Sequence, residues 1–126
     1  MGLVLARIGA VFYAIWGAFH VFVAWQIYQL ALANQGIAQG RLVQLAVYIL
    51  TIALFAIGIA AWRNWRNDRC GYWLNLLVVG WADIIWVVTV VIPGYVPADR
   101  GLIPPAIYVA GAILTTLARR TGAAAK

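Results

Sequence analysis

The chain has 126 residues, of which 66% are hydrophobic and only 10% are charged, and its net charge is +6. Soluble domains carry about 25% charged residues, so this composition predicts an integral membrane protein and excludes an ordinary water-soluble enzyme. The positive charge does not indicate nucleic-acid binding, because the arginines lie in short segments beside apolar runs, where they contact lipid headgroups.

Four apolar segments predict an all-α integral membrane protein that folds as a four-transmembrane-helix bundle. At about 20 residues per crossing, four helices use nearly the whole chain, so we expect no separate soluble domain. The first segment is too long and too rich in polar residues for a secretory signal peptide. The polar stretch NQGIAQG, 34–40, is expected to join the first two helices, and Pro93-Gly94 to end the third. The single domain, residues 1–126, should contain helices at approximately 8–33, 42–62, 72–92 and 102–118.

The basic residues are distributed unequally between the two sides of the predicted bundle. By the positive-inside rule, the side with more basic residues faces the cytoplasm, so both termini should be cytoplasmic. For a bacterial source, the location would be the inner membrane. Seven basic residues fall on the terminal side, namely Arg7, Arg63, Arg66, Arg69, Arg119, Arg120 and Lys126, against Arg41 and Arg100 on the other.

Two ionisable side chains occur inside the predicted membrane segments. Asp83 interrupts the apolar run Gly71–Pro93, and His20 lies in the first segment. A carboxylate at the centre of a spanning helix costs about 2.5 to 3.5 kcal/mol, so such residues usually face protein and have a partner. Each lies within about one turn of the centre of its helix, so we expect His20 and Asp83 to contact each other.

Helical periodicity predicts which side chains point into the bundle. We expect the inward faces to meet in a polar centre walled by Trp16, Trp86 and Trp81. The expected faces are Gly9, Tyr13, Gly17, His20, Ala24 and Ala31 on the first helix; Gln44, Tyr48, Thr51, Phe55, Gly58 and Trp62 on the second; Asn75, Val79, Ala82, Asp83, Trp86 and Thr89 on the third; and Tyr108, Gly111 and Thr115 on the fourth.

We predict that His20 and Asp83 carry proton-transfer chemistry, because an acid and a base at one place can move a proton. Each residue also has a structural interpretation: Asp83 can simply fix the packing, and a histidine in a core is more often structural. The residues expected to line a ligand site are Trp16, Thr51, Asn75, Trp86 and Tyr108.

No cofactor can be named from the sequence. The single histidine and the lack of glutamate argue against a di-metal site, and a bis-histidine haem would need a second chain. Cys70 is the only cysteine, which excludes a disulfide within the chain.

Three functions remain open. The first is binding of a small lipophilic molecule, or proton transfer to it, at His20 and Asp83. The second is a non-catalytic structural or assembly subunit of a larger membrane complex. The third is a proton-coupled transporter or channel, which would have to be a homo-oligomer, because four helices are few to enclose a pathway.

Overall fold

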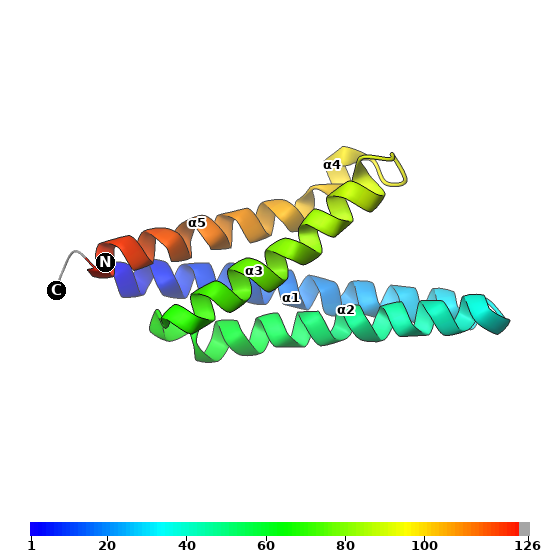
Figure 1. Ribbon diagram of the computed structural model, residues 1–126, viewed down its shortest axis with the longest axis horizontal. Helices are drawn as coiled ribbons and strands as arrows, with labels where there is room; N and C mark the ends of the chain where they lie inside the picture. The colour runs from blue at the N-terminus through cyan, green and yellow to red at the C-terminus, as the bar shows by residue number, and fades with distance from the viewer. Residues whose placement is uncertain (124–126) are drawn as a thin grey trace.

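The computed structural model describes residues 1–123 and contains helices without strands over that range (Figure 1). Three short elements accompany the long helices: the 3₁₀ turn η1 (Asn64–Arg66), the π-helical turn η2 (Val87–Val91) and α4 (Ala98–Gly101). The long helices are α1 (Gly2–Leu32), α2 (Gly36–Trp62), α3 (Arg69–Trp86) and α5 (Ile103–Ala123).

Four helical segments are long and apolar enough to cross a membrane, as the sequence predicted. Helices α1 and α2 begin earlier than expected, at Gly2 and Gly36, so the predicted connection 34–40 shortens to residues 33–35. Gly36 makes the turn with a φ of +63°, a conformation that favours glycine. Gly40 lies inside α2, because a single glycine weakens a helix but does not end it.

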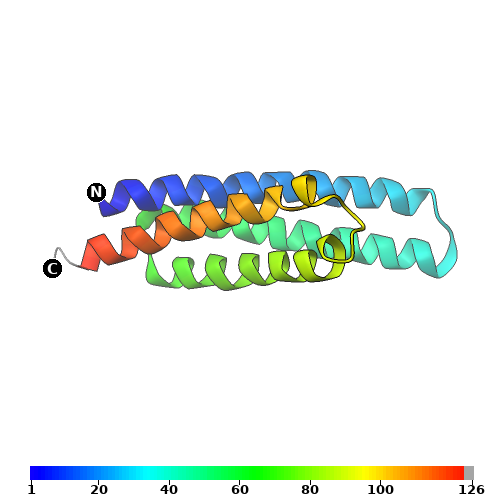
Figure 2. The ribbon, with the colours of Figure 1, turned by 90° about the horizontal axis from the view of Figure 1, so that it is seen from above.

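The helices alternate in direction, so α1 begins and α5 ends at the same end of the molecule (Figures 1 and 2). Backbone contacts join α1 to α2 and α5, and join α3 more lightly to the same two helices. Helices α1 and α3 therefore lie on a diagonal of the bundle, as same-direction helices do in an up-down arrangement. The α1–α2 hairpin extends past the other connection at the far end. Lys126 lies outside the described residues.

Helix α1 packs closely against its neighbours through small residues. A Cβ at Gly17 would lie 2.6 Å from Ile57 Cγ1 and 2.8 Å from the Ala53 carbonyl oxygen of α2. On the α5 side, a Cβ at Gly9 would lie 2.7 Å from Thr115 Cγ2. Glycines that permit such approach are typical of helix contacts in membranes. The predicted inward face of α1 is confirmed, with His20 half-buried and the other members buried.

The predicted inward face of α2 is wrong. The side chains of Gln44, Tyr48 and Thr51 are exposed on the outside of the bundle, and Trp62 also faces outward. In a membrane, lipid is as apolar as the core, so small side chains that allow close backbone approach mark the contact face better than polar ones. The buried residues of α2 are Ala46, Ala53, Ala56 and Ala60.

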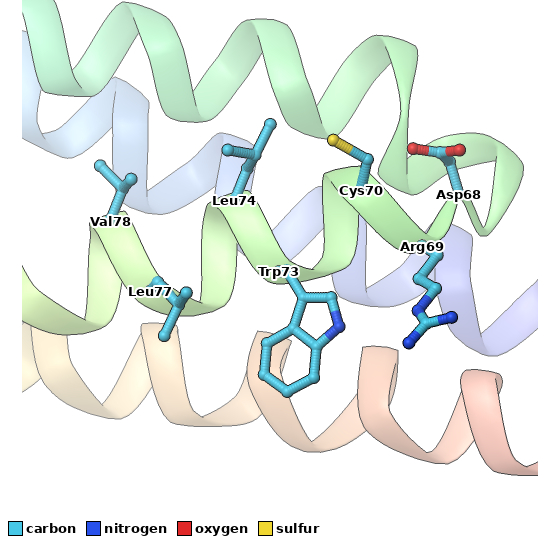
Figure 3. Close-up of a pocket in the computed structure, with 7 residues that line it drawn as sticks. All are labelled: Asp68, Arg69, Cys70, Trp73, Leu74, Leu77 and Val78. Carbon is cyan, nitrogen blue, oxygen red and sulfur yellow. The ribbon is translucent and has the colours of Figure 1, made fainter.

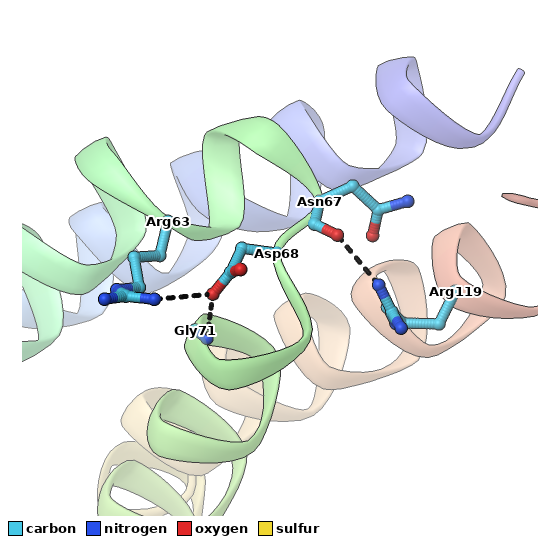
Figure 4. Close-up of polar contacts among 5 residues, drawn as sticks. All are labelled: Arg63, Asn67, Asp68, Gly71 and Arg119. Carbon is cyan, nitrogen blue, oxygen red and sulfur yellow. Dashed lines mark hydrogen bonds and ion pairs between the residues drawn. The ribbon is translucent and has the colours of Figure 1, made fainter.

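The connection between α2 and α3 is fixed at the arginine-rich end by polar contacts (Figure 4). Asp68 caps α3 by accepting a 2.9 Å hydrogen bond from the Gly71 N–H, and it pairs with Arg63 at 3.1 Å. These contacts hold the pKa of Asp68 below its ordinary value, with the Gly71 N–H as the larger cause. The Arg119 guanidinium donates to the Asn67 carbonyl at 2.8 Å, which joins the connection to α5.

Candidate functional site

Asp83 lies in the interior of the bundle with a side chain that is 4% exposed. Its partner is Trp16 of α1, whose indole N–H lies 3.1 Å from Asp83 Oδ1 and 3.2 Å from Oδ2. No arginine, lysine or histidine within residues 1–123 forms an ion pair with this carboxyl. The buried Asp83 carboxyl therefore has a single hydrogen-bond donor, the Trp16 N–H, which its two oxygens share.

His20 is attached to the same tryptophan by two contacts. Its imidazole stacks on the Trp16 indole with 3.7 Å between ring centroids, and its Nδ1 lies 2.8 Å from the Trp16 carbonyl oxygen. A carbonyl oxygen only accepts, so Nδ1 carries the proton in this bond. In the neutral ring, Nε2 then carries the lone pair and is the nitrogen able to accept a proton.

The expected direct contact between His20 and Asp83 is wrong, because neither a hydrogen bond nor an ion pair joins them. Helices α1 and α3 lie on the diagonal of the bundle, so similar depth does not make their side chains neighbours. The indole is long enough to cross this diagonal. The two ionisable groups are thus connected through Trp16, with His20 on its ring face and Asp83 at its N–H.

Asn75 and Tyr108 lie on the inner side of the bundle, as expected. Asn75 is buried and donates from Nδ2 to the Ala56 carbonyl of α2 at 3.3 Å. The Tyr108 hydroxyl of α5 donates to the Leu76 carbonyl at 2.9 Å. Gly80 makes this approach possible, because a Cβ there would collide with the Tyr108 hydroxyl. Both polar side chains connect helices across the interior.

The remaining predicted residues make no hydrogen bond to Asp83. The Trp86 indole donates to the Gly101 carbonyl at 2.8 Å and so joins the end of α3 to α4. Thr51 is exposed and donates to the Val47 carbonyl one turn back along α2. Trp81, expected as a wall of the site, is 65% exposed and faces outward. Of the three tryptophans, only Trp16 reaches the Asp83 carboxyl.

Two buried polar atoms between the long helices have no hydrogen-bond partner within the described chain. These are the Tyr13 hydroxyl, one helical turn before Trp16, and the Oδ1 atom of Asn75. Buried polar atoms are normally paired, so the centre of the bundle retains unused capacity for hydrogen bonds. Within residues 1–123, no group of three metal-ligating side chains comes together.

Sequence reasoning placed Trp16 at the site but missed its role as the donor to Asp83. The available signal was its position: a tryptophan one turn before His20, on a face lined by glycine and alanine, carries an indole N–H that can donate to a carboxylate.

Comparison with protein-family models, curated proteins and solved structures found no match to this chain. Its function must be inferred from the geometry of its own residues.

Proposed function

We propose that this chain is a membrane protein that binds a small lipophilic molecule at Asp83 and exchanges a proton with it through Asp83 or His20. The observation that supports this most strongly is the unusual state of Asp83, which is buried with one shared N–H donor and no cation. A buried carboxylate is stable only when its oxygens are well paired. An incoming hydrogen-bond donor would supply what the chain itself does not.

The chemistry of the site limits the kind of ligand. A hydroxyl, phenol or amine group can donate to Asp83, and an apolar body suits an approach from the bilayer. The His20 Nε2 atom supplies a proton acceptor on an imidazole that stacks on the same indole. Quinols and hydroxylated isoprenoids have the required combination of a donor group and an apolar body.

The placement in the membrane belongs to the same proposal. The four apolar segments have the length of spanning helices. The start of α1 and the end of α5 lie at the same end of the bundle. Arg7, Arg63, Arg66, Arg69 and Arg119 lie toward that end, which supports a cytoplasmic location of both termini. In a bacterial cell, the protein would be in the inner membrane.

Asp83→Asn tests the proposal, because asparagine keeps an oxygen that accepts from Trp16 but removes the acid. Asp99→Asn, an equivalent change at an exposed position in α4, is the matched control. We expect native mass spectrometry of gently extracted protein to show a bound lipophilic molecule in the wild type and in Asp99→Asn. Asp83→Asn should lose it while its melting temperature is unchanged. Equal retention by all three proteins, or no bound molecule in the wild type, would contradict the proposal.

A second candidate function, assembly with other membrane proteins, is favoured by the outer face of α2. Tyr48 and Thr51 lie near the midpoint of this helix and are exposed. A chain of side-chain hydrogen bonds runs along the same face, from Arg41 to Gln44 at 3.1 Å and from Gln44 to the Tyr48 hydroxyl at 2.7 Å. Polar side chains in spanning helices usually face other protein, so a partner helix would cover this face.

Assembly is tested by the mass of the detergent-solubilised particle. We expect light scattering coupled to size exclusion to report more than one chain in the wild type, as a homo-oligomer or a larger complex. Replacing Gln44 and Tyr48 by leucine and phenylalanine should reduce this mass, whereas Leu45→Ala, on the adjoining exposed surface, should not. A monomeric wild type without co-extracted protein would contradict this candidate.

A further inference from the structure

A shallow, open groove of about 570 Å³ runs along the surface of α3 between residues 68 and 78 (Figure 3). Its walls are mostly apolar, and charged side chains occur at only one end, where Asp68 and Arg69 begin the helix. The lining residues are Asp68, Arg69, Cys70, Trp73, Leu74, Leu77 and Val78.

The length of the groove matches one leaflet of a bilayer. From Asp68 to Val78, α3 rises by about 15 Å, which is half of a hydrocarbon core of about 30 Å. The charged end lies at the arginine-rich end of the bundle, and the apolar end reaches toward the middle of α3. A molecule with one charged group and an apolar chain of about this length fits such a surface.

Arg69 supplies a positive charge at the entrance of the groove, and its guanidinium is not paired with another side chain of the described residues. Arg63 is paired with Asp68, Arg119 binds the Asn67 carbonyl, and Arg7 lies over the Trp65 ring at 5.4 Å. By contrast, Arg69 makes no hydrogen bond or ion pair with any residue in the range 1–123. The guanidinium of Arg69 therefore remains free to bind a phosphate, a group that it can contact with two parallel hydrogen bonds.

The side chains are arranged so that charge and apolar surface adjoin. Figure 3 shows the Arg69 guanidinium and the Trp73 ring on the same side of α3, with Leu77 one turn further along. The carboxylate of Asp68 points to the opposite side, and its Oδ1 already accepts from Gly71 and Arg63. An anionic group beside Arg69 thus meets a free cation rather than an unpaired carboxylate.

We infer that this groove binds one anionic phospholipid, with its phosphate at Arg69 and an acyl chain along Trp73 and Leu77. Charge complementarity and the length of the groove both favour a phospholipid over a peptide. Basic pockets beside spanning helices are known to hold anionic lipid headgroups, and each arginine near a membrane surface contributes about 1 kcal/mol. That free energy corresponds to about a fivefold change in affinity.

The test titrates phosphatidylglycerol or phosphatidylcholine into delipidated protein in detergent and measures the apparent Kd by native mass spectrometry. We expect phosphatidylglycerol to bind more tightly, and Arg69→Gln to weaken its binding about fivefold. Arg120→Gln is the matched control, because it removes an exposed arginine at the same end of the bundle but outside the groove. Its effect should be less than about twofold.

A second variant tests the apolar part of the groove without changing charge. Leu77 is exposed to the groove, so Leu77→Trp should fill it, weaken binding of both lipids and leave the melting temperature unchanged. Equal affinity for the two lipids, or equal losses in Arg69→Gln and Arg120→Gln, would overturn the inference. So would unchanged binding in Leu77→Trp.

Discussion

Replacement of Gly17 by alanine examines how closely α1 and α2 approach. The added Cβ would lie 2.6 Å from Ile57 Cγ1 and 2.8 Å from the Ala53 carbonyl oxygen, whereas carbon atoms in contact are about 3.5 to 4.0 Å apart. The Ile57 side chain can turn away, but the carbonyl belongs to the backbone of α2. The two helices must therefore separate, which typically costs about 1 to 3 kcal/mol.

Gly58→Ala is the matched control, because Gly58 lies in the interior of α2 and a Cβ there meets nothing within 4 Å. Replacing glycine by alanine in a helix is itself worth about 1 kcal/mol, and both variants gain it. We therefore expect Gly17→Ala to be less stable than Gly58→Ala by about 1 to 3 kcal/mol. Reversible unfolding in mixed micelles, followed by circular dichroism, measures this difference. Equal stability of the two variants would refute the close contact.

Three further predictions concern the ends and faces of the helices. Because the pKa of Asp68 is lowered in the folded state, its carboxylate stabilises the fold above the ordinary pKa of about 3.9, and this effect is lost as pH falls through the folded pKa. The melting temperature of Asp68→Ala should therefore fall further below that of the wild type at pH 7 than at pH 3. A difference that does not change with pH would contradict this prediction. Trp86→Phe removes the hydrogen bond to the Gly101 carbonyl and should destabilise the protein by about 1 kcal/mol in the same unfolding assay. Trp81→Phe, on the exposed surface, should not destabilise it. Equal effects of the two substitutions would argue against the Trp86–Gly101 hydrogen bond. Ala53→Leu, on the buried face of α2, should destabilise the protein by about 1 to 3 kcal/mol. Thr51→Leu, on the exposed face, should change the unfolding free energy by less than about 0.5 kcal/mol. The reverse order would show that the face carrying Thr51 is the inward one.

Much of the fold could be predicted from the sequence, because long apolar segments predict long helices and small residues mark their close contacts. The inward face of α1 followed from the spacing of Gly9, Tyr13 and Gly17. The same reasoning failed for α2, where polar residues were taken to face inward although the buried positions are alanines. For helices as apolar as this one, small side chains that allow close backbone approach mark the contact face better than polar side chains do.

The sequence predicted that Asp83 faces the interior of the bundle, but it did not predict which side chain contacts this residue. The sequence placed Asp83 and His20 at similar depth, because the position of a residue along its helix determines its depth in the bundle. It does not provide the order of helices around the bundle, which puts α1 and α3 on the diagonal. At that separation the imidazole does not reach the carboxyl, and Trp16 connects the two. The groove beside Arg69 depends on the direction of side chains around α3, which helix boundaries alone do not show.

The contact between Trp16 and Asp83 is central to this account, and a double-mutant cycle tests it most directly. Unfolding free energies would be measured for the wild type, Trp16→Phe, Asp83→Ala and the double variant. Polar contacts between spanning helices couple by up to about 1.7 kcal/mol, so we predict a coupling energy of about 1 kcal/mol or more. Single effects that add within about 0.3 kcal/mol would contradict the contact and, with it, the site proposed around Asp83.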